Sequence, residues 1–167
     1  LESFNAEHEF SQLAAIYGQQ TKAGGLEFHY AAQPGLDQDV VTDRHKVFQI
    51  VGNLLENSIK YTNSGSVSLD VALETQSGTN DSWLKIRVKD PGIGIDAVDL
   101  DKIFEPFYQV DSSYSRSYNG LGIGLSIAKS MLIRLGGHIE CKSEVGKGTE
   151  FQLRVPVQTG SSDGHTP

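Results

Sequence analysis

The sequence predicts an α+β two-layer sandwich in which a mixed β-sheet carries its helices on one face. Segments with apolar residues at helical spacing alternate along the chain with segments in which every second residue is apolar. The resulting order is helix, strand, helix, two strands, a long loop, helix and two strands, which favours a sheet covered by helices. The 167 residues, 38% of them hydrophobic, suffice for one domain with a sizeable core.

The N-terminal part begins with a predicted helix over residues 10–23, which ends at two glycines. A strand of alternating apolar residues is expected over 26–30. A long helix then begins with Thr42 or Asp43 as its N-cap and ends before Asn63.

Two alternating strands follow, around residues 67–73 and 84–88, joined by a polar loop. Residues 90–118 contain glycines and then many polar residues, with no clear periodicity. Because compact domains seldom contain long irregular stretches without a reason, this one is either functional or conceals a further element.

The last part of the chain is predicted to hold a helix over 122–135 and a closing hairpin with strands at 139–143 and 149–157. The remaining polar residues read as a disordered linker. We therefore expect one domain over residues 1–157 and a tail over 158–167.

Composition narrows the functional classes. A net charge of −7 disfavours a nucleic-acid binder, because phosphate contacts need basic surface. No apolar run reaches the roughly 18 residues of a membrane span, and no signal peptide opens the chain, so we expect a cytoplasmic segment without membrane contact, in a parent protein that could still be membrane-anchored. The single cysteine, Cys141, excludes an internal disulfide and is expected to be an inert thiol in a strand.

One face of the long helix carries Asn53, Asn57, Lys60 and Tyr61, at positions i, i+4, i+7 and i+8. Two carboxamides, an ammonium and a phenol suit a nucleotide, because an amide oxygen can bind Mg²⁺ and a lysine can neutralise phosphate. Taken alone, the same face could be an ordinary solvated helix surface.

Two glycine-containing motifs lie further along. Asp90 directly follows a strand and precedes Gly92 and Gly94, so its carboxylate could accept a hydrogen bond from an exocyclic amine, although Asp-Pro-Gly is also a common turn. Glycines at 120, 122 and 124 expose backbone N–H groups where a helix begins, which makes an anion site. No Walker or dinucleotide fingerprint accompanies them.

Together and in this order, the motifs resemble the catalytic domain of sensor histidine kinases, in the ATPase superfamily that includes DNA gyrase B, MutL and the large heat-shock chaperone. The resemblance implies the Bergerat-type ATP-binding fold and covers nearly the whole chain. Its motifs are the N box (residues 53–62), the first glycine box (90–94), the F box (104–107), the second glycine box (120–125) and a closing Gly-Thr element (148–151).

The resemblance also implies ligands, ATP and Mg²⁺, and a role for each residue. Asn57 would bind Mg²⁺, while Asn53 and Arg116 would act at the phosphates as the catalytic pair. Residues 108–119 would form an ATP lid that carries Arg116. Lys60, Gly120, Leu121, Gly122, Gly124 and Leu125 would contact the phosphates, and Tyr61, Asp90, Gly92, Gly94, Ile95 and Thr149 would form the adenine pocket.

The implied activity is transfer of the ATP γ-phosphoryl group to a histidine on a helical dimerisation and phosphoacceptor domain of the same protein, with a receiver domain or response regulator downstream. His8 is a poor candidate acceptor, because the two long helices that should follow such a histidine are missing before the N box. A conformational ATPase is disfavoured because Asn53 stands where those relatives place a water-orienting glutamate. A non-catalytic nucleotide sensor remains an alternative.

Overall fold

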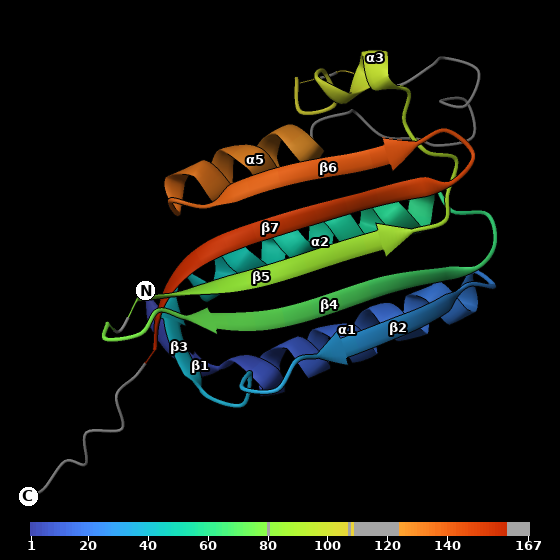
Figure 1. The fold of residues 1–167 in the computed structure, drawn as a ribbon. Coiled ribbons are helices and arrows are strands. Elements are labelled where there is room, and N and C mark those ends of the chain that lie inside the picture. The colour runs from blue at the N-terminus through green and yellow to red at the C-terminus, as the bar shows by residue number, and fades with distance from the viewer. Residues whose placement is uncertain (80, 107, 109–123, 160–167) are drawn as a thin grey trace, which may run out of the picture.

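The structure is a computed structural model that describes residues 1–79, 81–106, 108 and 124–159. Its described part is one mixed sheet with helices packed behind it (Figure 1). The elements, in chain order, are β1 (Glu2–Asn5), α1 (Ala6–Ala23), β2 (Glu27–Ala32), β3 (Asp39–Thr42), α2 (Arg44–Lys60), β4 (Ser66–Thr75), β5 (Asp81–Asp90), α3 (Ala97–Leu100), α5 (Gly124–Arg134), β6 (His138–Glu144) and β7 (Gly148–Thr159).

The seven-stranded sheet has the order β1-β3-β7-β5-β4-β2. β7 pairs with β5 along one edge, and its other edge pairs first with β6 and then with β3. The β2–β4 pair is parallel and the other pairs are antiparallel, so the predicted mixed sheet is confirmed.

The core lies between the sheet and the helices. Alternate residues of β4, β5 and β7 face inward, as the period of two requires, and Val67, Leu69 and Val71 are fully buried. The stripe predicted on the long helix, Val47, Ile50, Val51, Leu54 and Ser58, is buried in full. Each such aliphatic side chain contributes about 1.5–3 kcal/mol by leaving water, and this packing holds α2 against the sheet.

Several element boundaries differ from the expectations. α1 begins at Ala6, because the Asn5 side chain accepts a hydrogen bond from the His8 N–H at 2.8 Å and caps the helix. β1 and β3 are four residues each, too short to show a period in sequence. The irregular stretch after β5 contains the short helix α3, capped by Asp96. β7 continues through Thr159, where it pairs with β3.

The long helix begins after Asp43, which caps it as one of the two predicted residues, and Tyr61 is its C-cap rather than a residue of its last turn. Among the described residues, none of the helices combines the length and apolar character needed to cross a membrane.

Candidate functional site

The described residues of the N box, the first glycine box and the Gly-Thr element lie at one end of the sheet. β5 ends there at Asp90, α2 ends there at Lys60, and the turn between β6 and β7 lies beside them (Figure 1). This convergence joins segments that are far apart in sequence.

Asp90 closes β5 with its side chain on the helix-covered face. It is 5% exposed, and its Oδ1 accepts a hydrogen bond from the Gly92 N–H at 2.9 Å. Burial raises the pKa of Asp90 above its ordinary value, and the hydrogen bond from Gly92 opposes that rise. The site thus contains a desolvated carboxylate, which can accept a hydrogen bond from a ligand.

The glycines around Asp90 are needed for space. A Cβ at Gly92 would collide with the Tyr61 carbonyl oxygen and the Asp90 carboxylate. A Cβ at Gly94, where φ is +75°, would collide with the Glu144 carbonyl, and one at Gly148 would collide with the Asp90 carbonyl. The glycine-box loop, the end of α2 and the β6–β7 turn therefore pack backbone against backbone.

Backbone hydrogen bonds hold the same segments together. The Ile93 N–H donates to the Tyr61 carbonyl at 3.3 Å, and the Gly146 N–H donates to the Ile93 carbonyl at 2.9 Å. Thr149 is buried and pairs across the sheet with Asp90. These contacts hold the glycine-box loop between the end of α2 and the β6–β7 turn. Asp90 and Thr149 therefore lie side by side on neighbouring strands at this end of the sheet.

The four polar N-box side chains predicted to contact the nucleotide are half-buried: Asn53, Asn57, Lys60 and Tyr61. The Asn53 amide nitrogen donates to the Gly124 carbonyl at 3.3 Å, which places the last glycine of the second glycine box beside the N box. The Lys60 ammonium lies 5.4 Å from the centre of the Tyr61 ring. Asn57, one turn from Asn53, is half-buried on the same helix. The helix α5, which contains Leu125, packs against α2.

Other predicted site residues lie outside the described residues. They are Arg116, Gly120, Leu121 and Gly122, with all of the expected lid over 108–119 except Tyr108.

Two hydroxyl groups at this site, those of Thr62 and Ser143, were assigned no role from the sequence. Thr62 is buried, and its hydroxyl donates a hydrogen bond to the Ser58 carbonyl at 2.6 Å. The same hydroxyl lies so close to Gly92 that a side chain added at Gly92 would contact it. Ser143 is hydrogen-bonded to both the glycine-box loop and Thr149. A signal for Ser143 exists in the sequence, because it continues the inward alternation of Ile139 and Cys141 and so places a polar group where an apolar one is expected.

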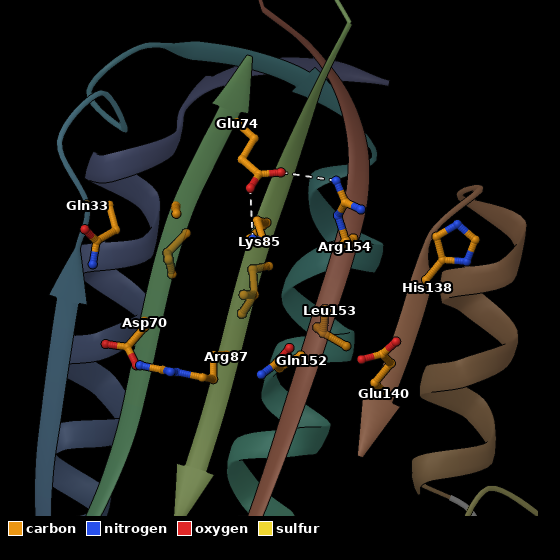
Figure 2. A pocket seen from close by; sticks show the side chains of 13 residues that line it. Gln33, Asp70, Glu74, Lys85, Arg87, His138, Glu140, Gln152, Leu153 and Arg154 are labelled. Atoms are coloured by element: carbon orange, nitrogen blue, oxygen red, sulfur yellow. Dashed lines mark hydrogen bonds and ion pairs between the residues drawn. The ribbon is translucent and has the colours of Figure 1, made fainter. Parts of the chain in front are cut away.

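A separate hollow of about 550 Å³ lies on the helix-free face of the sheet (Figure 2). Five of its charged side chains pair with one another: Glu74 with Lys85 at 2.9 Å and with Arg154 at 3.1 Å, and Asp70 with Arg87 at 2.8 Å. None of the residues predicted to bind the nucleotide lines this hollow, so we assign the hollow no part in the nucleotide site.

Comparison with known protein families identifies the family to which this site belongs. The family described as histidine kinase-, DNA gyrase B-, and HSP90-like ATPase matches residues 42–159, which include every described motif. The chain belongs to this family. Within it, the chain is an ATP-binding catalytic domain of the histidine kinase class.

Curated relatives of the catalytic domain are sensor and hybrid kinases. The autoinducer 2 sensor kinase/phosphatase LuxQ of Vibrio vulnificus is 38% identical over 96% of this chain and 19% of its own length. The sensor histidine kinase AtsR of Burkholderia thailandensis is 42% identical over 76% of this chain and 21% of its own length. Hybrid signal transduction histidine kinase B of Dictyostelium discoideum is 40% identical over 79% of this chain and 7% of its own length. The catalytic domain thus spans about a fifth or less of these relatives.

Solved structures share its fold. Full-length ShkA in complex with AMPPNP aligns with a TM-score of 0.80 and 26% identity, over 97% of this chain and 32% of ShkA. The nucleotide-free catalytic domain of the histidine kinase ThkA aligns with a TM-score of 0.70 and 21% identity, over 93% of this chain and 96% of the ThkA domain. The predicted fold class is therefore confirmed.

Proposed function

We propose that this domain binds Mg²⁺-ATP and transfers the γ-phosphoryl group to a histidine on a separate helical dimerisation domain. The observation that carries the proposal is the buried carboxylate of Asp90, which stands at a strand end between the N-box helix and the β6–β7 turn. The AMPPNP bound by ShkA supports an adenine nucleotide as the ligand.

Each residue has a specific task in this proposal. Asp90 accepts the adenine amine, with Gly92, Gly94, Ile95, Tyr61 and Thr149 around the base. Lys60 and Gly124 contact the phosphates, together with Leu125 and, outside the described residues, Arg116, Gly120, Leu121 and Gly122. The Asn57 amide oxygen holds Mg²⁺, a hard cation that prefers oxygen ligands and neutralises phosphate charge. Positioning and charge neutralisation are the main contributions to phosphoryl transfer.

The contacts of Glu56 favour a kinase over a conformational ATPase. A water-orienting carboxylate needs a place at the γ-phosphate, but that place on α2 holds Asn53, whose amide is not a base. Glu56 is exposed and accepts a hydrogen bond from the Tyr17 hydroxyl of α1 at 3.3 Å. This carboxylate is therefore directed to α1, and Asn53 occupies the place where a conformational ATPase needs its base.

His8 does not fit the role of phosphoacceptor. It is exposed in the first turn of α1, where its N–H is bonded to the Asn5 cap. α1 begins at the end of the sheet opposite to the β6–β7 turn (Figure 1). We therefore propose that the acceptor lies on another domain of the same protein, with a receiver domain or response regulator after it. The tail expected over 158–167, whose first two residues belong to β7, would link the catalytic unit onward.

Incubation with γ-labelled ATP tests the proposal. The domain alone should retain ATP with little hydrolysis and no stable self-labelling, while addition of the helical acceptor domain should produce acid-labile phosphate on that partner. Asn57→Ala should abolish the transfer, because it removes the Mg²⁺ ligand. Label on His8, or rapid phosphate release without the partner, would contradict the proposed function.

A further inference from the structure

The Ser143 side chain joins three segments of the adenine site. Its Oγ accepts a hydrogen bond from the Ile95 N–H at 2.7 Å, lies 2.8 Å from the Gly148 carbonyl oxygen and lies 2.8 Å from Thr149 Oγ1. Ser143 and Thr149 face each other across the β6–β7 pair, and Thr149 faces Asp90 across the β5–β7 pair. One hydroxyl thus contacts the glycine-box loop and both residues of the Gly-Thr element.

The chemistry of these partners determines where the protons lie. A serine hydroxyl has one proton to donate and two lone pairs to accept with. The carbonyl of Gly148 can only accept, so the Ser143 proton goes to it, and the Ile95 N–H fills one lone pair. All three contacts are then hydrogen bonds if Thr149 donates its own proton to the second lone pair of Ser143.

Thr149 is left as an acceptor. With its proton given to Ser143, its oxygen offers only lone pairs to a ligand, and the ionised carboxylate of Asp90 beside it also only accepts. The Asp90–Thr149 end of the site therefore matches a ring that presents an amine. A ring with an oxo group at that position would place lone pairs against lone pairs, which leaves buried polar groups unpaired.

We propose that Ser143 is a positioning residue that sets base specificity: by holding the Thr149 proton, it makes the site select a 6-aminopurine over a 6-oxopurine. The inference rests on the proposed adenine site at Asp90. Ser143 acts through its hydrogen bonds to Thr149 and to Ile95 in the glycine-box loop, and it does not need to contact the base.

The test compares ATP with ITP, which carries an oxo group in place of the adenine amine. Calorimetric titration of Ser143→Ala should show weaker ATP binding and unchanged or tighter ITP binding, so that the ATP/ITP preference falls roughly three- to tenfold, the effect of one neutral hydrogen bond. Thr149→Val should lower the preference as well, and Ser143→Ala should then add no further change in the double variant.

Ser82→Ala is the matched control. Ser82 is a buried serine of β5 whose hydroxyl has no partner among the described residues, and it lies far along the strand from Asp90. Its replacement should leave the preference unchanged. Ser143→Thr, which keeps the hydroxyl, should retain the wild-type preference, and Ser143→Cys, which replaces it with a weak donor, should lower it even if Ser143→Ala does not fold.

Two outcomes would overturn the inference: equal weakening of ATP and ITP by Ser143→Ala, which indicates mere structural support, or no change in either. A separate variant, Asp90→Asn, tests the proposed function itself. If that variant binds ATP as the wild type does, the adenine site itself is misplaced. If it loses ATP while Ser143→Ala shifts both nucleotides equally, the site stands and only the role of Ser143 is rejected.

Discussion

The side-chain amide of Asn53 is hydrogen-bonded to the main-chain carbonyl of Gly124, 71 positions later in the sequence. This contact joins the middle of α2 to the first residue of α5. It brings the N box and the end of the second glycine box together.

Asn53→Ala should therefore affect both stability and binding. Loss of this partly exposed hydrogen bond should lower the free energy of unfolding by at most about 1 kcal/mol, measured by urea denaturation. ATP affinity should fall several-fold. Gln19→Ala, on the exposed side of α1, is a control that should change neither property. An unchanged affinity for ATP would remove Asn53 from the phosphate site.

Asp90→Asn should separate binding from stability. The variant loses the charged acceptor for the adenine amine, so we expect ATP affinity to fall by about 1–3 kcal/mol, or roughly five- to hundredfold. Because burial raises the pKa of Asp90, its ionised form destabilises the fold at neutral pH, and the neutral amide should not lower the melting temperature. Calorimetry and thermal melts measure the two effects. A large loss of stability would show that Asp90 is mainly structural.

The raised pKa of Asp90 also predicts a pH dependence. The native state holds this proton more tightly than the unfolded state, so the stability contributed by the protonated form is lost as pH rises through the native pKa. ATP binding runs the other way, because only the carboxylate is a full acceptor. Affinity should decline on acidification at a higher pH than for an ordinary aspartate, and this decline should be absent in Asp90→Asn.

Gly78 and Gly94 both have a positive φ angle, but they should tolerate replacement by alanine very differently. At Gly78 φ is +83° and nothing lies within 4 Å of an added Cβ, so Gly78→Ala should cost about 1–2 kcal/mol for the left-handed conformation alone. At Gly94 φ is +75° and a Cβ would strike the Glu144 main chain, so Gly94→Ala should cost more than about 4 kcal/mol. Denaturant titration measures both; equal costs would contradict the close packing of loop and turn.

Cys141 should be chemically inert in the native domain. Burial raises the pKa of its thiol to about 12, with a smaller contribution from the charge of Asp90. At pH 8 only about one part in ten thousand is then thiolate, against about a quarter for a free cysteine. Reaction with a disulfide reagent should be slow in buffer and fast in denaturant. Fast labelling of the native protein would show that the β6 edge opens.

Much of the fold could be predicted because its signals are local. The buried stripe of α2 and the alternation of β4, β5 and β7 depend on periods of 3.6 and two residues, and these are visible in the sequence. Asp90 at a strand end and the face carrying Asn53 and Asn57 were found in the same way. The start of α1 was misplaced by four residues because its cap, Asn5, lies within a strand too short to recognise.

What the sequence by itself determined is which residue types stand at which positions of each helix and strand: a carboxylate after β5, amides on one face of α2, and glycines where main chains meet. Only the tertiary structure decided that β7 pairs with three strands, that Gly94 is pressed against the β6–β7 turn, and that the hydroxyl of Ser143 meets Thr149 and Ile95. The reason is physical: periodicity arises within one element, whereas pairing order and side-chain hydrogen bonds depend on how distant elements share one core.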